Sequence, residues 1–280
     1  MKIDTHQHFW KYNERDYGWM GEGMGVLKRD RLPGDLAPLL QETGIDGTVT
    51  VQARQSLEET EWLLQLADEN TFIKGVVGWA DLRSGQLEEQ LDRFSSHPKL
   101  CGVRHVVHDE PDDQFMMRDD FVRGIGKLAD YNLTYDLLLF PKHLPVACEL
   151  VAMFPGQRFV LDHISKPFIK DGKIEPWADD IRGLASFENV ACKISGMVTE
   201  ADWHNWKPED FRPYMDIVLD AFGADRIMIG SDWPVCTVAG KYADVIRIAA
   251  EFVQGLSKDE QAAVWSENAK RAYLLSDVNR

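Results

Sequence analysis

The sequence predicts an α/β fold of the (β/α)8 barrel type, the TIM barrel, built as a single domain over residues 1–280 with a long loop after strand 1. Short apolar segments alternate with amphipathic segments, and we count eight strands in this alternation. The strands are mostly apolar, as parallel strands are when both of their faces are covered. Eight β/α units in 280 residues match the usual length of this barrel, about 250 residues.

Each expected strand is short and is followed by a helix or a loop that leads into one. The strands are predicted at residues 1–8, 48–53, 73–80, 100–107, 134–140, 158–164, 190–195 and 226–231. The helices are predicted at residues 36–43, 86–94, 121–131, 144–153, 176–186, 208–222, 242–254 and 257–275, with one more that begins at Ser56. No stretch has the composition of a linker between domains.

Several helix boundaries have a local chemical signal. Ser56 with Glu59, and again Ser257 with Glu260, have the spacing of a capping box. In that motif the serine and glutamate side chains satisfy backbone N–H groups of the first helical turn. Gly44 follows the helix at residues 36–43, and glycine favours the left-handed conformation that ends helices.

Residues 9–33 form a polar, aromatic and glycine-containing stretch that is too long for an ordinary connection. It contains Trp10, Tyr12, Tyr17 and Trp19. Because long ordered loops in compact domains are commonly functional, we expect this loop to form a lid or a pocket wall.

A doubly wound open sheet is the alternative fold. Such sheets usually carry a glycine-rich dinucleotide-binding turn after the first strand. In this chain His6-Gln7-His8-Phe9-Trp10 stands in that place, so the barrel is favoured.

Composition excludes several classes of partner. The formal net charge is −15, which disfavours nucleic acid and anionic membranes, because both bind basic surfaces. The N-terminus lacks the features of a signal peptide, and no apolar stretch is long enough to span a membrane. We therefore expect a cytoplasmic protein. The four cysteines, Cys101, Cys148, Cys192 and Cys236, are far apart and are expected to be free thiols.

The histidines are placed where a barrel has its active site. In this fold the chemistry lies at the C-terminal ends of the strands. Seven of the eight histidines lie at or just beyond a predicted strand end, or in a loop that leads from a strand to a helix; only His97 precedes a strand. One shared site at one mouth of the barrel explains this distribution.

His6 and His8 are the most informative of these residues. Their spacing places both side chains on one face of the first strand. Two histidines in this arrangement can chelate a divalent metal or bracket a substrate oxygen. The alternative is that they are polar residues that close a strand at the surface.

Several segments together resemble the amidohydrolase superfamily, and within it the sugar-lactonase branch of the L-fuconolactonase and L-rhamnonolactonase type. The superfamily-wide signals are His6 and His8 on strand 1, His163 on strand 6 and Asp232 on strand 8. The segments that are similar to the lactonases include IDTHQHFW, TVTVQARQSLEET, GVVGWADLRS, GVRHVVHDEPDD, LTYDLLLFPKHL, FVLDHISKP, CKISGMVTEADW and IMIGSDWPVC. The similarity covers about residues 2–275.

The resemblance implies a hydrolase that opens a sugar-acid lactone, L-fuconolactone or a similar aldonolactone, in L-fucose or L-rhamnose catabolism. Asp232 is assigned as the general base on water, with His6, His8 and His163 at the carbonyl oxygen or at a metal. The resemblance allows two mechanisms. In one, a zinc or manganese ion is held by His6, His8, His163 and Asp232; in the other, no metal is required. Related metalloenzymes usually have a further ligand on a middle strand, and strand 5 offers none.

A neutral lactone rich in hydroxyl groups needs polar donors and an apolar wall. The expected substrate-binding residues are Arg54, Trp79, His105, His108, Trp203 and Trp233. The alternative to substrate binding for Arg54 and Arg104 is a buried salt bridge. For His108 and Trp203 the alternative is a loop residue that is only packed or solvated. Lys166 either shapes a turn or binds substrate, and Asp136 is expected to pair with a neighbouring cation.

Three other functions are compatible with parts of the pattern. A metal-dependent decarboxylase of the same superfamily would use a similar constellation. A lactonase for a dicarboxylate, of the pyrone or muconolactone type, would need several arginines such as Arg54, Arg83 and Arg104 at the substrate. A non-catalytic sugar-binding protein would have no use for a hydrolytic base. A small-molecule lactone is therefore the expected partner, and a homo-oligomer is compatible with the sequence.

Overall fold

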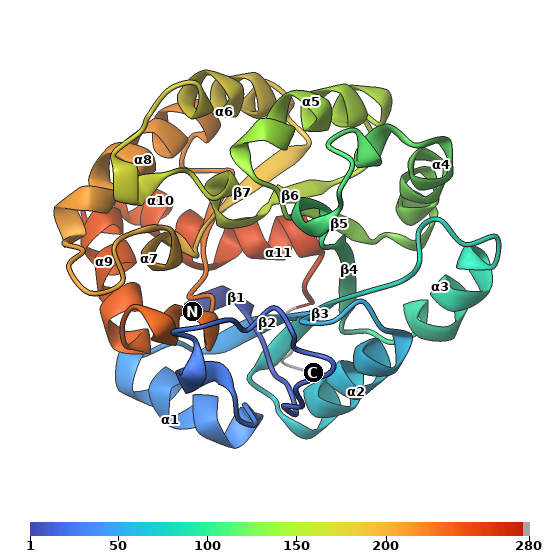
Figure 1. Ribbon diagram of the computed structural model, residues 1–280, viewed down its shortest axis with the longest axis horizontal. Helices are drawn as coiled ribbons and strands as arrows, with labels where there is room; N and C mark the ends of the chain where they lie inside the picture. The colour runs from blue at the N-terminus through green and yellow to red at the C-terminus, as the bar shows by residue number, and fades with distance from the viewer. Residues whose placement is uncertain (277–280) are drawn as a thin grey trace.

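The computed structural model describes residues 1–276 and has eight parallel strands arranged as a ring, with helices around the outside (Figure 1). The strands pair in chain order from β1 to β8. A backbone bridge between Gln7 and Trp233 joins the two ends of the sheet. The predicted (β/α)8 barrel is confirmed, and the open sheet is not formed.

The strands are shorter than predicted. They are β1 (Ile3–Gln7), β2 (Gly47–Val51), β3 (Ile73–Gly78), β4 (Leu100–His105), β5 (Thr134–Leu137), β6 (Phe159–Leu161), β7 (Val190–Ile194) and β8 (Ile227–Ile229). The residues that were expected to extend β4, β5, β6 and β8 leave the sheet and turn over the mouth of the barrel. At β6 and β8 the cause is visible, since Asp232 and the residues from His163 to Lys166 have positive φ.

The helices agree closely with the sequence prediction. They are α1 (Pro33–Thr43), α2 (Leu57–Glu69), α3 (Leu87–Ser95), α4 (Asp119–Leu128), α5 (Leu144–Met153), α6 (Trp177–Ala185), α7 (Met197–Glu200), α8 (Pro208–Phe222), α9 (Tyr242–Val253), α10 (Lys258–Ala262) and α11 (Asn268–Tyr273). Short α7 was not predicted. The helix expected at 257–275 is interrupted by a π-helical turn, Ala263–Glu267, between α10 and α11.

Helix α11 closes the end of the barrel opposite the strand C-termini. The backbone carbonyl of Ala272 accepts a hydrogen bond from Thr134, at the start of β5, at 2.5 Å. Asn268 donates to the carbonyl of Ile227, at the start of β8, at 2.6 Å. Tyr273 packs into the interior of the barrel, where it is almost fully buried. The other mouth is therefore the one available to a substrate.

Of the two predicted capping boxes, one forms completely and the other only in part. At Ser257 the full capping box forms with Glu260. At Ser56 the hydroxyl accepts from the N–H of Glu59, but the Glu59 carboxylate does not return to Ser56. That carboxylate instead accepts from the backbone N–H groups of Ala53 and Arg54, at 2.9 and 2.7 Å, and so holds the chain just after β2.

The loop at residues 9–33 is ordered around its own small core. Trp10, Tyr17, Met20 and Leu27 are buried together. Trp10 and Arg31 exchange backbone hydrogen bonds at 2.9 and 2.8 Å, which brings the two ends of the loop together. Arg54, after β2, forms an ion pair with Asp16 of the loop. These contacts fix the loop against the barrel mouth.

The expectation that the cysteines are free thiols is confirmed. All four cysteines are free, three of them buried and Cys148 half-buried. In this part of the chain no helix combines the length and apolarity needed to cross a bilayer.

We predict that Glu59 makes the stability of the fold depend on pH. Burial raises the pKa of Glu59 to about 7, from an ordinary value of 4.5. The folded chain therefore binds the proton more tightly, and stability falls as the pH rises from about 4.5 through 7, by up to about 1.4 kcal/mol for each unit of pKa shift. Glu59→Gln keeps an oxygen acceptor and removes this decline.

Urea unfolding at pH 5 and pH 8 measures the effect. The Glu59→Gln protein should gain stability relative to wild type at the higher pH. Glu61→Gln, on the exposed face of the same helix, is the matched control and should follow wild type. Equal pH slopes for wild type and Glu59→Gln would contradict this account.

Candidate active site

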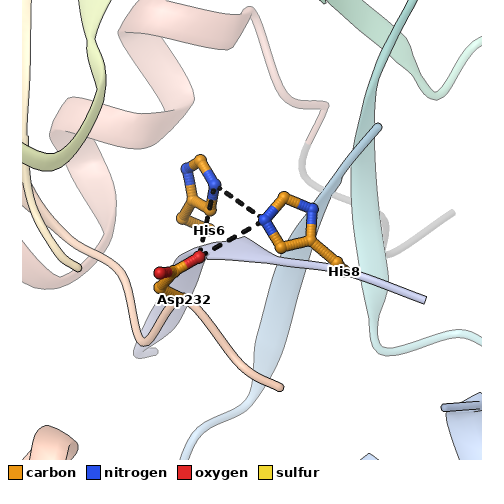
Figure 2. A group of neighbouring side chains, drawn as sticks. All are labelled: His6, His8 and Asp232. Atoms are coloured by element: carbon orange, nitrogen blue, oxygen red, sulfur yellow. Dashed lines mark hydrogen bonds and ion pairs between the residues drawn. The ribbon is translucent and has the colours of Figure 1, made fainter. Parts of the chain in front are cut away.

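The barrel brings His6, His8, His163 and Asp232 together at the C-terminal mouth, although they are up to 226 residues apart in sequence. Figure 2 shows His6 and His8 from β1 facing Asp232 from the turn after β8. The Nε2 atoms of His6 and His8 are 3.1 Å apart. Asp232 Oδ1 lies 3.3 Å from His8 Nε2 and 3.9 Å from the Nε2 atoms of both His6 and His163.

This cluster fits one divalent cation. For a tetrahedral zinc with metal–ligand distances of about 2.0–2.1 Å, neighbouring ligand atoms are about 3.4 Å apart. The separations of 3.1, 3.3 and 3.9 Å among His6 Nε2, His8 Nε2 and Asp232 Oδ1 bracket that value, so these three residues form one possible metal site. His163 lies with His6 and Asp162 in a second possible group. The rings of His8 and His163 are also held from behind, by the carbonyl of Val51 and the hydroxyl of Ser195, each at 2.8 Å. Such outer contacts are typical of histidines that bind metals.

Strand β5 contributes a buried ion pair and no metal ligand. Asp136 on β5 does not face the cluster; it accepts a hydrogen bond from Lys193 on β7 at 2.6 Å. The expectation that Asp136 pairs with a neighbouring cation is confirmed, and the structure identifies that cation as Lys193. Within residues 1–276 the possible ligand groups are therefore His6 with His8 and Asp232, and His6 with Asp162 and His163.

The backbone at this mouth is strained where it carries the reactive side chains. His163 has φ 54° and Asp232 has φ 58°, in the left-handed region that non-glycine residues rarely adopt. Asp232 is held there by a hydrogen bond from its N–H to the carbonyl of His6 at 2.8 Å. Strain of this kind is retained where the surrounding contacts determine the conformation, and it is common at active sites.

Two glycines allow the strands to approach this closely. A Cβ on Gly230 would lie 2.6 Å from Cβ of His6. A Cβ on Gly196, where φ is +63°, would lie 2.6 Å from Nδ1 of His163. A larger residue at either position would therefore clash with His6 or His163.

The protonation states suit a base flanked by neutral imidazoles. Burial by itself would raise the pKa of Asp232, but His163 and His8 outweigh it and hold that pKa below its ordinary value. Burial also lowers the pKa of His6 and of His163 well below the ordinary value for histidine. At neutral pH the aspartate is ionised, and these two imidazoles are neutral.

A pocket of about 300 Å³ opens directly above the cluster. Its volume suits a small molecule of the size of one sugar ring. Its wall comes from the first loop and from the loops after several strands. The lining residues are His8, Trp10, Trp19, Ala53, Arg104, Val106, His108, Asp109, Leu138, His163, Lys166, Asp232 and Val235.

Of the six residues expected to bind substrate, the structure places His108 in this lining and the others outside it. Arg54 lies in a neighbouring surface groove and pairs with Asp16. Trp203 donates its indole N–H to the carbonyl of Thr199 at 2.9 Å. Trp233 is 1% exposed and packs edge-on against Phe9.

The remaining two expected residues contact each other. The indole N–H of Trp79 faces Nδ1 of His105 at 3.4 Å. The other side of the His105 ring is taken by Glu110, at 2.7 Å, and its face stacks on Phe115. Because the ring nitrogens of Trp79 and His105 already have partners, these two residues stabilise the loop after β4.

The pocket wall includes residues that the sequence left undecided or did not single out. Trp10 and Trp19 provide the aromatic surface, as expected of the first loop. Lys166 lines the pocket and donates to Glu200 at 3.1 Å. Asp109 lines it and pairs with its neighbour His108 at 2.8 Å. Nothing in the local sequence distinguishes these loop positions from ordinary surface residues.

The fold and site define a (β/α)8-barrel protein with a histidine–aspartate centre able to hold one cation. The profile of the amidohydrolase family matches residues 3–275. The chain belongs to the amidohydrolase family.

Similar proteins extend over nearly the whole chain. An L-fucono-1,5-lactonase of Burkholderia multivorans is 41% identical, covering 99% of this chain and 97% of that protein. An L-fucono-1,5-lactonase of Burkholderia ambifaria is 37% identical, with 98% and 96% covered. A crystal structure of a Burkholderia multivorans amidohydrolase with bound zinc has a TM-score of 0.95 at 41% identity, with 99% and 100% covered.

We predict that Gly196→Ala displaces His163 and weakens the binding of a cation. Gly172 is a matched control, because its φ is also +63° but no atom lies within 4 Å of the position of a Cβ. Both variants should lose about 1 kcal/mol of stability from the backbone conformation alone. Only Gly196→Ala should lose zinc affinity, by at least tenfold, measured by calorimetric titration. Equal zinc affinities for the two variants would show that His163 does not need this close approach.

Proposed function

We propose that this protein hydrolyses a sugar lactone, L-fucono-1,5-lactone or a close aldonolactone, to the free aldonic acid. The proposal is supported by the relatives of that activity at 41% and 37% identity, which match almost the full length of the chain. The observation that carries it is the convergence of an ionised Asp232 with His8 and His163 in the lining of a small pocket, with His6 buried next to them. We place this activity in the cytoplasm and in one domain over residues 1–280.

Asp232 acts as the general base. Its carboxylate is held in the ionised form, and it takes a proton from the water that attacks the lactone carbonyl. The same group then delivers the proton to the ring oxygen as the ester bond breaks, which leaves the open aldonic acid. Trp233, next in the chain, donates its backbone N–H to Ser231 and keeps the turn after β8 in place, with 3.0 Å between the two atoms.

The histidines stabilise the negative charge that develops on the carbonyl oxygen. His8 and His163 line the pocket beside the Asp232 carboxylate, where an oxygen of the substrate can meet them, and His6 lies buried next to them. A zinc or manganese ion held by these three histidines and Asp232 would polarise the carbonyl and acidify the water. The zinc-bound crystal structure of the similar Burkholderia amidohydrolase favours zinc.

The charges near the pocket favour a neutral substrate over a dicarboxylate or an aromatic acid. Arg54 and Arg83 are each paired with an aspartate outside the pocket lining. Arg104 donates to Asp162, and Lys166 donates to Glu200. Because each of these cations already has a carboxylate partner, the substrate does not need to supply one. Trp10 and Trp19 offer the apolar faces on which a sugar ring stacks.

A screen of sugar lactones with a pH indicator tests the proposal. The panel holds L-fucono-, L-rhamnono-, L-galactono- and D-arabinono-lactones, with a pyrone dicarboxylate and an aromatic acid as the competing substrate classes. We expect acid release from L-fuconolactone first, and a lower rate after treatment with a chelator that zinc restores. Activity on the dicarboxylate or release of CO2, with no lactone opened, would replace this proposal by one of its rivals.

We predict that Asp232→Asn lowers kcat by at least 100-fold, because the amide cannot accept the proton from water. The shape of the side chain is kept, so the folded structure and KM should change little. Asp112→Asn, at an exposed position, is the control. A rate within tenfold of wild type on a good lactone would remove Asp232 from the role of base.

A further inference from the structure

His108 and Asp109 are adjacent residues whose side chains both line the pocket. They belong to a 3-10 turn, Val107–Asp109, that follows strand β4. The same pocket is lined by Asp232, the proposed base. Because the pocket has the size of one sugar ring, a lactone whose carbonyl lies beside Asp232 also lies against this turn.

The two cations of the pocket lining are paired with carboxylates that lie outside it. Arg104 donates to Asp162 at 2.9 Å, and Lys166 donates to Glu200 at 3.1 Å. Neither Asp162 nor Glu200 belongs to the lining. The pair formed by the two residues of the turn is different, because both of its members belong to the pocket wall. A substrate in the pocket can therefore meet both members at once.

Each member of this pair has one polar atom engaged and one left over. Nδ1 of His108 lies 2.8 Å from Oδ1 of Asp109. Within residues 1–276, neither Nε2 of His108 nor Oδ2 of Asp109 has a hydrogen-bond or ion-pair partner. The imidazole also packs on the ring of Phe140, with 4.7 Å between the ring centroids. The carboxylate and Phe140 thus hold the imidazole in one orientation and leave Nε2 uncommitted.

The charge of Asp109 suits hydroxyl groups better than carboxylates. The hydrogen bond from His108 holds the pKa of Asp109 below its ordinary value, although burial acts in the opposite direction. Asp109 is therefore ionised at neutral pH and can only accept hydrogen bonds. Hydrogen bonds to an ionised acceptor are about twice as strong as those between neutral groups. Sugar hydroxyls can donate to this oxygen, whereas a substrate carboxylate would be repelled.

We propose that His108 and Asp109 are a hydroxyl-binding pair that selects lactones with two neighbouring ring hydroxyls. Nε2 of His108 meets one hydroxyl, and Oδ2 of Asp109 accepts a hydrogen bond from the other. Asp109 is also a positioning residue, because its Oδ1 orients the imidazole. The inference rests on the proposed function and names the feature of the substrate that the same pocket selects.

A comparison of two six-membered lactones tests the pair. L-Fucono-1,5-lactone carries ring hydroxyls, and δ-valerolactone has the same ester ring without them. A site that binds a substrate hydroxyl discriminates against the analogue that lacks it. In Asp109→Asn and in His108→Phe, the ratio of kcat/KM for the fuconolactone to that for δ-valerolactone should fall by about tenfold or more, mainly through KM. His108→Phe keeps an aromatic ring against Phe140 and removes both nitrogens.

Asp113→Asn is the matched control. Asp113 is an exposed carboxylate of the same loop that also pairs with a histidine, His143, and with Lys142. It does not belong to the pocket lining. Its substitution should leave the ratio of the two lactones at the wild-type value.

Binding of L-fucose gives a readout that needs no hydrolysis. This sugar has the same ring hydroxyls as the fuconolactone but no ester. In calorimetric titrations, Asp109→Asn and His108→Phe should bind L-fucose about tenfold more weakly than wild type or Asp113→Asn. If wild type opens no lactone but binds L-fucose with this pattern, the proposed function fails and the hydroxyl-binding pair stands.

Two outcomes would overturn the inference. One is an equal loss of kcat/KM on both lactones in the two variants, which would assign the pair to support of the loop alone. The other is an unchanged affinity for L-fucose in folded Asp109→Asn and His108→Phe proteins. The side chain of Asp109 is 65% exposed, so Asp109→Asn is expected to fold, and circular dichroism checks this.

Discussion

The structure depends on the neutralisation of charges that are buried inside the barrel. Lys193, Asp136, Asp162 and Arg104 have almost no exposed surface, and their side chains pair with one another at 2.6–3.0 Å. Removing one partner from a buried ion pair typically costs about 3–5 kcal/mol, because the other charge is left uncompensated. This requirement links β4, β5, β6 and β7 and gives the ring of His6 a rigid and polar support.

The two ends of the barrel are connected through the same charges. Tyr273 of α11 donates to both oxygens of Asp136 at 2.9 and 2.7 Å, from the end of the barrel opposite the pocket. Asp136 pairs with Lys193, and Lys193 reaches His6, which is buried next to His8 and Asp232 of the pocket lining. The C-terminal helix that closes one end of the barrel is therefore in contact, through three side chains, with the proposed reaction centre at the other end. In Figure 1 this helix, α11, is seen across the ring of strands.

The polar ends of the strands explain why the catalytic centre was more predictable than the substrate pocket. His6 lies in the last part of β1, and His8, His163 and Asp232 lie just beyond apolar strands. The barrel places all such positions at one mouth. Trp79, His105 and Trp233 also lie at or just beyond strand ends, and Trp203 lies after α7, yet their side chains pack into loops or pair with neighbours. Whether a side chain beyond a strand end turns inward depends on loop conformation, which short-range sequence patterns do not specify.

By itself, the sequence determined the barrel, its eight strands and most helix boundaries, and its resemblance to the amidohydrolases led us to propose four residues for the reaction centre. It could do so because apolar periodicity and strand-end position are local properties of the chain. Only the tertiary structure decided the partners of the buried charges. Asp162 and Lys193 are 31 positions apart in sequence, and Arg104 is further still. The surroundings of both His6 nitrogens are set by residues from different strands that meet only when the barrel closes.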